Sequence, residues 1–424
     1  MDPLFISKFA IWVSAFAGVI SAIVAGLFYV RTHKEQKKKK ASLLRANIPS
    51  DIFDIYLSPM YKAIASYEKT GDKESKASTL GQIADVLQQQ GQIEEALHIL
   101  QEEQLPLYEE QNNLKLKAQT FGQIAKLLFK KGQIEEALRI RYEEQIPIFE
   151  RLNDVRSKAL TMGKIADILE QQGQIEEALR IRYEEQLPIF DQLGDLRSKA
   201  ATLDQISKLL LTMGNYEEAL RVLRNEQLPI FEYIGDIRSK AIAMGSIAKA
   251  LQQQGDLDEA LHIILEEQIP AFEQLADERD KISSLQQVAE IKMQQGRCDE
   301  ALALQTEQIL PSLRKIQDAP NTGMILFSIA QNRLTNGGLE KGEAQLIYDE
   351  LSESFQINLQ LNHAEGIAAS GALLGQLLTM GGNFNKALEV LEISKKAASN
   401  LEYSNIMQQI KKLENQIHQI QNNE

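Results

Sequence analysis

Apolar residues recur along this chain at helical spacing, in a unit that repeats every 41 residues. Within one unit, Ser198–Met213 carries apolar side chains at the three- and four-residue intervals of an amphipathic helix, and a second such run begins at Ile134–Leu138 of another unit. A glycine separates the two runs, at Gly91, Gly132, Gly173, Gly214, Gly255 and Gly296. Self-similarity of this length indicates stacked helical units, because each unit buries its apolar face only against its neighbours.

Polar residues mark where each helix begins. The first run of every unit follows an Asp or Asn, and both are strong helix N-caps. These residues are Asp72, Asn113, Asp154, Asp195, Asp236, Asp277 and Asp318. The glycine suits the position just after a helix end, where the backbone commonly turns left-handed. Each unit is therefore predicted to consist of a first helix (helix A), a tight turn and a second helix (helix B).

Small residues at two fixed places give the unit a family resemblance. Seven residues before the glycine stand Ala84, Ala125, Ala166, Ser207, Ala248 and Ala289, and five residues after it stand Ala96, Ala137, Ala178, Ala219, Ala260 and Ala301. Small side chains there would let helix A pack closely on helix B. This spacing resembles the tetratricopeptide repeat (TPR), and Leu374-Gly375, Gly382-Asn383-Phe384 and Ala387-Leu388 resemble it more closely still.

The resemblance covers residues 72–400 and implies an all-α, TPR-like α-solenoid whose helix-turn-helix repeats form a right-handed superhelix. The period of 41 exceeds the usual ~34 by about two helical turns, so the helices should be long, as in variants that resemble kinesin light chain. We expect about eight hairpins in 72–400, an N-terminal capping helix in 51–71 and a C-terminal capping helix in 401–424. The last has an apolar stripe of Ile406, Ile410, Leu413, Ile417 and Ile420.

A proline stands in each helix B, fifteen residues after the glycine: Pro106, Pro147, Pro188, Pro229, Pro270 and Pro311. A proline inside a regular helix costs about 3 kcal/mol, so each must be accommodated. Either helix B bends there, or a new helical segment starts at the proline. The bend is favoured, because the preceding Leu105 or Ile146 caps a helix poorly.

The N-terminal region has a different pattern. Phe9–Val30 is 22 residues long and has no charge, which is enough to cross a bilayer as a single transmembrane helix within 1–30. A basic juxtamembrane stalk follows in 31–50, with Lys37–Lys40 near its start. The positive-inside rule then places the N-terminus outside and the repeats in the cytoplasm. A cleaved signal peptide is the alternative, but the span is long and no small-x-small cleavage site closes it.

Small residues recur every fourth position in that span: Ala10, Ser14, Gly18, Ala22 and Gly26. Such a stripe allows close helix-helix contact in a membrane, and also arises by chance in spans rich in small residues. It makes a homo-oligomer through the transmembrane helix one expectation.

Charge and chemistry narrow the class of function. Residues 1–40 have a balance of +5, which leaves −18 on the rest of a chain of net charge −13. An acidic body of this kind argues against nucleic acid as a partner. Cys298 is the only cysteine, the five histidines are dispersed, and no nucleotide-binding loop or hydrolase motif occurs. We therefore expect no catalytic residues, no metal and no cofactor.

Two rows of charged residues on helix A are candidates for function. The position just after the small residue reads Asp85, Lys126, Asp167, Lys208, Lys249 and Glu290. If helix A lines the concave groove, as the TPR resemblance implies, these mixed charges suit a polar peptide; a merely solvated face is the alternative. The second row is Lys76, Lys117, Lys158, Lys199, Lys240 and Lys281. Pairing with the Glu-rich helix B of a neighbouring repeat is favoured over an anion site.

The sequence thus predicts a membrane-anchored TPR-type scaffold or adaptor that binds protein or peptide partners at the cytoplasmic face, by binding and not by turnover. An assembly or quality-control factor for envelope or membrane proteins, acting like a chaperone, is the alternative. An enzyme is the third class, and a metal or nucleotide in the purified chain would be its sign.

Overall fold

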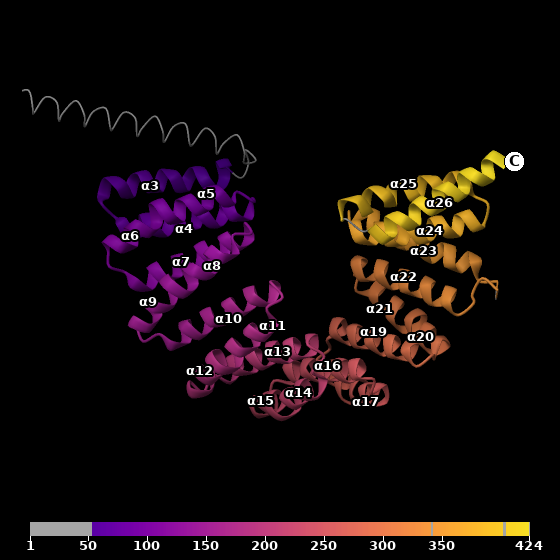
Figure 1. The fold of residues 1–424 in the computed structure, drawn as a ribbon, viewed down its shortest axis with the longest axis horizontal. Helices are drawn as coiled ribbons and strands as arrows, with labels where there is room; N and C mark the ends of the chain where they lie inside the picture. Colours follow the sequence, from indigo (N-terminus) through magenta and orange to yellow (C-terminus); the bar gives the residue numbers. More distant parts are fainter. Residues whose placement is uncertain (1–52, 341, 402–403, 424) are drawn as a thin grey trace, which may run out of the picture. The chain divides into compact units, whose positions relative to one another are not determined.

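A computed structural model describes residues 53–340, 342–401 and 404–423, and every regular element in these ranges is a helix. The chain divides into two compact units, Met1–Ile189 and Phe190–Glu424, and each is described by itself (Figure 1). The predicted transmembrane span Phe9–Val30, its stripe of small residues and the stalk 31–50 lie outside the described residues. Among the helices that are described, none combines the length and the apolar character needed to span a bilayer.

The first unit holds a lone helix and three hairpins. A short π-helical turn, η1 (Phe53–Leu57), leads into α3 (Ser58–Thr70), which packs on α4 (Figure 1). In each hairpin, helix A is one long helix and helix B runs through an α, a π and an α segment. The hairpins are α4 (Lys73–Gln89) with α5 (Ile93–His98), η2 (Ile99–Gln104) and α6 (Leu105–Glu110); α7 (Leu114–Lys130) with α8 (Ile134–Arg139), η3 (Ile140–Gln145) and α9 (Ile146–Arg151); and α10 (Val155–Gln171) with α11 (Ile175–Arg180), η4 (Ile181–Gln186) and α12 (Leu187–Gln192).

The second unit continues this pattern and then simplifies. Its first three hairpins are α13 (Leu196–Thr212) with α14 (Tyr216–Arg221), η5 (Val222–Gln227) and α15 (Leu228–Ile234); α16 (Ile237–Gln254) with α17 (Leu257–Ile263), η6 (Ile264–Gln268) and α18 (Ile269–Gln274); and α19 (Glu278–Gln294) with α20 (Cys298–Leu304), η7 (Gln305–Ile309) and α21 (Leu310–Lys315). Two hairpins of unbroken helices follow, α22 (Ala319–Thr335) with α23 (Ala344–Gln360), and α24 (Ala364–Met380) with α25 (Phe384–Asn400). The last helix, α26 (Ser404–Asn423), packs on α24 and α25 and buries Ile410, Leu413 and Ile417.

The predicted helix ends are confirmed. Each of the seven Asp or Asn residues is an N-cap whose side chain accepts a hydrogen bond from the backbone N–H three residues later, at 3.0–3.2 Å. The six glycines that follow helix A all have positive φ, from 74° at Gly91 to 99° at Gly255. A residue with a Cβ is strained in this left-handed region, which explains the glycine at each turn. The small residues of the TPR-like pattern are all buried where helix A meets helix B.

The prolines are accommodated by a π-helical turn in each helix B. At the first of them, the Leu105 N–H donates to the carbonyl of Leu100, five residues back instead of four. The wider turn relieves the clash that the ring of Pro106 would make with the carbonyl four residues earlier in an α-helix. Gln104 and Leu105 keep right-handed helical angles, and no side chain caps a new helix. Helix B is therefore continuous through the proline, and the widened turn accommodates the ring without the start of a new helix.

Candidate partner-binding face

The predicted groove residues lie on helix A, at equivalent places in successive hairpins. Asp85, Lys126, Lys208, Lys249 and Glu290 are exposed, and Asp167 is half-buried. Two of the six have partners within the chain: Lys208 pairs with Asp204 at 2.6 Å, and Asp167 pairs with Arg182 at 2.5 Å and with Lys164 at 3.0 Å. The row is thus accessible, and its use by a partner stays a prediction.

The second row of lysines forms ion pairs between hairpins, as favoured from the sequence. Each lysine of the row contacts a carboxylate eight residues earlier, at the end of the preceding helix. The pairs are Lys76–Glu68, Lys117–Glu109, Lys158–Glu150, Lys199–Asp191, Lys240–Glu232 and Lys281–Glu273. All of these pairs are partly exposed, so each contributes little to stability and mainly fixes how one hairpin meets the next.

A row of buried glutamines in helix B was not anticipated from the sequence. Gln104, Gln145, Gln186, Gln227 and Gln268 stand two residues before the first five of the six prolines, and all are buried. In four of the hairpins the amide faces a helix A glycine: a Cβ added at Gly81, for example, would lie 2.6 Å from the Gln104 nitrogen. The amide nitrogen also donates to a helix A carbonyl, from Gln104 to Ala77 at 3.0 Å and from Gln227 to Ala200 at 3.1 Å.

The amide oxygens of these glutamines differ in what they accept. Gln104 accepts from the Thr120 hydroxyl at 3.3 Å, Gln145 from Arg141 at 3.0 Å, and Gln186 from Arg182 at 3.3 Å. The oxygens of Gln227 and Gln268 are buried and have no donor among the residues that the structure describes. Substitutions at equivalent positions of the repeats explain why these two oxygens lack a donor.

At Gln227 both equivalent donors are replaced by apolar residues. Leu223 occupies the position of Arg141 and Arg182, and Ala243 occupies the position of Thr120. At Gln268 the arginine position is Ile264, and the threonine position is Ser284, whose hydroxyl donates to the Asp280 carbonyl at 2.9 Å. A buried acceptor without a donor costs about 1–3 kcal/mol. A ligand N–H or O–H that donated a hydrogen bond to either oxygen would therefore recover this free energy.

Two arginines are buried beside the groove row in the first unit. Arg141 is 6% exposed and Arg182 is 2% exposed, and within the described part of the chain the Nε atom of each has no acceptor. Arg182 forms the ion pair with Asp167. No carboxylate oxygen of the described residues lies within 4.0 Å of Arg141, and burial lowers its pKa to about 10 against the opposing charge of Asp167. Equivalent positions therefore hold one paired and one unpaired buried cation.

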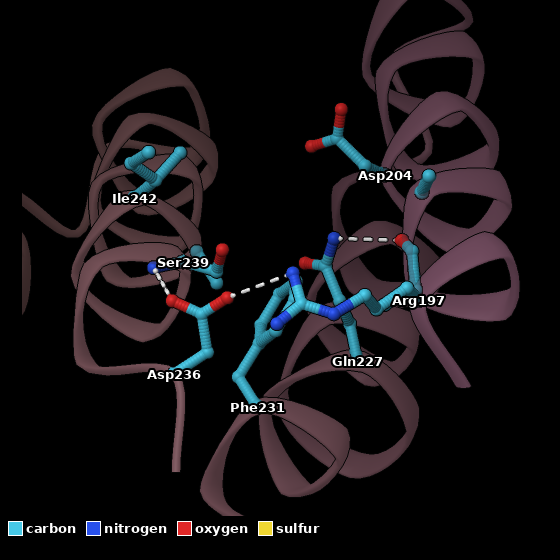
Figure 2. Close-up of a pocket in the computed structure, with 10 residues that line it drawn as sticks. Arg197, Asp204, Gln227, Phe231, Asp236, Ser239 and Ile242 are labelled. Atoms are coloured by element: carbon cyan, nitrogen blue, oxygen red, sulfur yellow. Dashed lines mark hydrogen bonds and ion pairs between the residues drawn. The ribbon is translucent and has the colours of Figure 1, made fainter. Parts of the chain in front are cut away.

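A pocket opens at the replaced position in the second unit, between α13 and α16 (Figure 2). Ala200, Ala201, Phe231, Ile242 and Ala243 form its apolar walls. Its polar lining consists of Arg197, Asp204, Gln227, Asp236 and Ser239. Figure 2 shows the Gln227 amide between the two helices and the ion pair of Arg197 with Asp236.

The acids of this pocket are already engaged. Asp236 caps α16 through the Ser239 N–H at 3.0 Å and lies 3.6 Å from the Arg197 guanidinium. The hydrogen bonds from Ser239 and the nearby arginine charges hold the pKa of the Asp236 carboxyl below its usual value. Asp204, which stands where four other hairpins have glycine, is neutralised by Lys208. The pocket therefore has apolar walls, a free acceptor and balanced charge.

Comparison with known proteins supports the repeat type. A family model for the tetratricopeptide repeat matches residues 77–102, which cover most of α4, all of α5 and most of η2. A search of curated proteins gave no match.

Solved structures were also compared. The TPR-sensor-containing signal transduction ATPase with numerous domains from Pyrococcus horikoshii is 17% identical, with a TM-score of 0.51, over 84% of this chain and 48% of that one. A Podosopora anserina protein described as a kinesin light chain with nearly identical TPR-like repeats is 18% identical, with a TM-score of 0.40, over 49% of this chain and 97% of that one. A Rap protein complexed with competence and sporulation factor is 16% identical, with a TM-score of 0.40, over 88% of this chain and 98% of that one.

At these identities the comparison with the Pyrococcus chain concerns the fold alone. The repeated hairpins, the matched residues and this structural likeness together support a TPR-type, all-helical repeat fold for the chain.

Proposed function

We propose that this chain is a membrane-anchored TPR-type scaffold that binds protein or peptide partners at the cytoplasmic face, without catalytic turnover. The observation that carries partner binding is the pocket between α13 and α16, where apolar walls surround a buried acceptor that has no donor among the described residues. Ligand sites commonly combine apolar walls with a few fixed polar groups in this way.

The exposed side of helix A supports a peptide as the partner. Leu160 and Ile242 occupy equivalent places on α10 and α16, and each is about half exposed. Lys249 lies about two helical turns after Ile242 on α16. Lys126 occupies the equivalent place on α7, and both lysines are exposed. Apolar side chains interleaved with charges give a surface on which a peptide's side chains provide specificity while its charges guide association.

Charge reversal tests the use of this face. Lys126, Lys208 and Lys249 should be changed together to Glu in the full chain, and partners crosslinked in intact membranes should be identified by mass spectrometry. We expect weaker capture with an unchanged circular-dichroism melt, because exposed charges add little stability. The control changes the exposed Lys62, Lys315 and Lys396 to Glu, with the same change in net charge. Equal capture by both triple variants would remove helix A from the binding surface.

The membrane anchor is supported by the uncharged span Phe9–Val30 and the lysines behind it. Protease added to sealed spheroplasts should spare residues 41–424, and permeabilisation should expose them. Digestion of the repeats in sealed spheroplasts, or a mature N-terminus within residues 15–31, would contradict the anchor and its orientation. Gly18→Ile with Gly26→Ile should weaken self-association in a membrane two-hybrid assay if the small-residue stripe is a contact.

A further inference from the structure

We propose that the pocket between α13 and α16 binds a primary carboxamide, the side chain of a glutamine or asparagine in a partner peptide. The assignment rests on the proposed partner-binding function and names the group that this site selects. It is carried by one acceptor, one donor and the apolar walls between them.

The acceptor is the amide oxygen of Gln227. This side chain is 2% exposed and is held by the bond from its nitrogen to the Ala200 carbonyl, which leaves the oxygen directed elsewhere. No donor of the described residues reaches that oxygen. The unpaired acceptor is specific to its context, because the arginine and threonine that serve equivalent glutamines are here Leu223 and Ala243. A ligand N–H would complete the bond that other hairpins make internally.

The donor is the guanidinium of Arg197. Its side chain is 78% exposed, and its contact with Asp236 is long, at 3.6 Å. The equivalent Arg238 is engaged more fully, with Asp277 at 2.8 Å and Asp280 at 2.6 Å. A guanidinium has five N–H donors, so Arg197 retains several for a ligand oxygen. Arg197 and Gln227 line the same pocket (Figure 2), so one group that both donates and accepts can contact the two.

The walls set the shape and charge of that group. Phe231, Ile242 and Ala201 offer apolar contacts for methylene groups. A ligand carboxylate has no hydrogen for Gln227 and would approach Asp204 and Asp236. A ligand ammonium would meet Arg197, while both acids already have cationic partners. A neutral carboxamide satisfies the acceptor and the donor together without burying a new charge, and its planar N–H and C=O groups can face the two partners at once.

Access to the Gln227 oxygen requires side-chain movement, because this atom is buried. The Gln227 oxygen is buried, while Arg197 and Ile242, which line the same pocket, are exposed and free to rotate toward solvent. Ile242 is 48% exposed, so its rotation costs little packing. Gln268 also has an unpaired oxygen, but the arginine of its hairpin, Arg238, is held by two carboxylates. The donor-acceptor pair is thus formed at Gln227 and not at Gln268.

The test uses small probes of matched shape on the full chain in detergent. Propionamide is compared with 2-butanone, which lacks the N–H donor, and with propionate, which adds a charge. The signal is the δ1 methyl resonance of Ile242 in isoleucine-labelled protein, identified by its loss in Ile242→Val. We expect propionamide to shift this resonance saturably, with an apparent affinity about tenfold above that of either analogue, since one extra buried hydrogen bond discriminates by about this factor.

Two variants test whether the preference for propionamide arises at Gln227. Gln227→Met removes the acceptor at similar length, and Ile309, buried at the equivalent position, shows that this site accepts an apolar residue. It should abolish the preference for propionamide over 2-butanone, while Gln268→Met should keep it. Equal binding of the three probes to the unaltered chain, or an unchanged preference in Gln227→Met, would overturn the assignment. Partner capture in membranes without probe discrimination would overturn the carboxamide alone and leave partner binding standing.

Discussion

Arg141 and Arg182 occupy equivalent buried positions and differ in their partners, which makes the same substitution at both a test of the ion pair with Asp167. The change is Arg→Leu, because Leu223 fills this position, fully buried, in the next hairpin. Each substitution removes the donor to a buried glutamine oxygen, at a cost of about 1–3 kcal/mol. Each also buries a leucine, which gains about 1.5–3 kcal/mol. These two contributions are common to both variants.

The contributions that differ come from charge. Arg182→Leu also removes the 2.5 Å contact with Asp167, and a hydrogen bond between charged groups contributes about 1.5–3 kcal/mol. Asp167 is 36% exposed and keeps Lys164 as a second partner, which places the loss near the lower end of that range. Arg141→Leu removes a buried cation with no carboxylate in contact, and such a replacement is often neutral or stabilising. Arg182→Leu should therefore unfold more easily than Arg141→Leu by about 2 kcal/mol.

Urea unfolding of the full chain in detergent, followed by circular dichroism, measures the stability of each variant. Since repeat arrays need not unfold in one step, amide hydrogen exchange within Val155–Gln171 should accompany it, because Asp167 lies on that helix. Exchange there should accelerate in Arg182→Leu and stay the same or slow in Arg141→Leu. Equal destabilisation by the two substitutions would show that the Arg182–Asp167 contact contributes nothing and would refute the reasoning.

Two further predictions concern the second unit. Gly371→Ala should destabilise by about 1–3 kcal/mol, because its Cβ would lie 1.9 Å from the Ser394 hydroxyl oxygen, whereas Gly381→Ala meets only ordinary contacts and should be neutral in the same urea titration. Burial raises the pKa of Glu350 above its usual value despite its contact with Arg333. The folded state then binds more protons than the unfolded state, so stability falls as pH rises through this window. The free energy of unfolding relative to Glu350→Gln should fall as the pH rises above the ordinary glutamate range of about 4, and a rise would contradict the assignment.

The parts of the fold that the sequence predicts are those that depend on one residue and its own backbone. The Asp and Asn caps and the left-handed glycines follow from the conformational preferences of single residue types, and the buried small residues were predicted from a repeated pattern that resembles the TPR. The ion pairing of the lysine row was predicted because an unpaired cation near a helix start is unfavourable and the Glu-rich helix B stood close by in the sequence. These features needed no knowledge of how far apart the helices lie.

The π-turns and the buried glutamines depend on three-dimensional distances. A proline shows only that one backbone donor is missing, and a widened turn, a bend and a new helix all answer that need. A glutamine in a helix is ordinarily expected at the surface, and its burial follows from the close approach of helix A at glycines such as Gly81. The sequence signal was present as a glutamine two residues before five of the six prolines, but its meaning needed the opposing glycine.

The ion pair between a lysine and a carboxylate at each hairpin junction has a consequence for the evolution of the repeat array. Because every junction from Lys76 to Lys281 uses the same contact eight residues apart, the two ends of a unit match the ends of any other. Loss or duplication of one whole unit in the gene would join surfaces that already fit, while any other length would break the pairing and shift the caps. The nearly identical Gly132–Phe149 and Gly173–Phe190 have the similarity that recombination requires. The array can therefore gain or lose whole repeats during evolution. A specialised pocket such as that at Gln227 can then change its position in the order of repeats while its own residues stay the same.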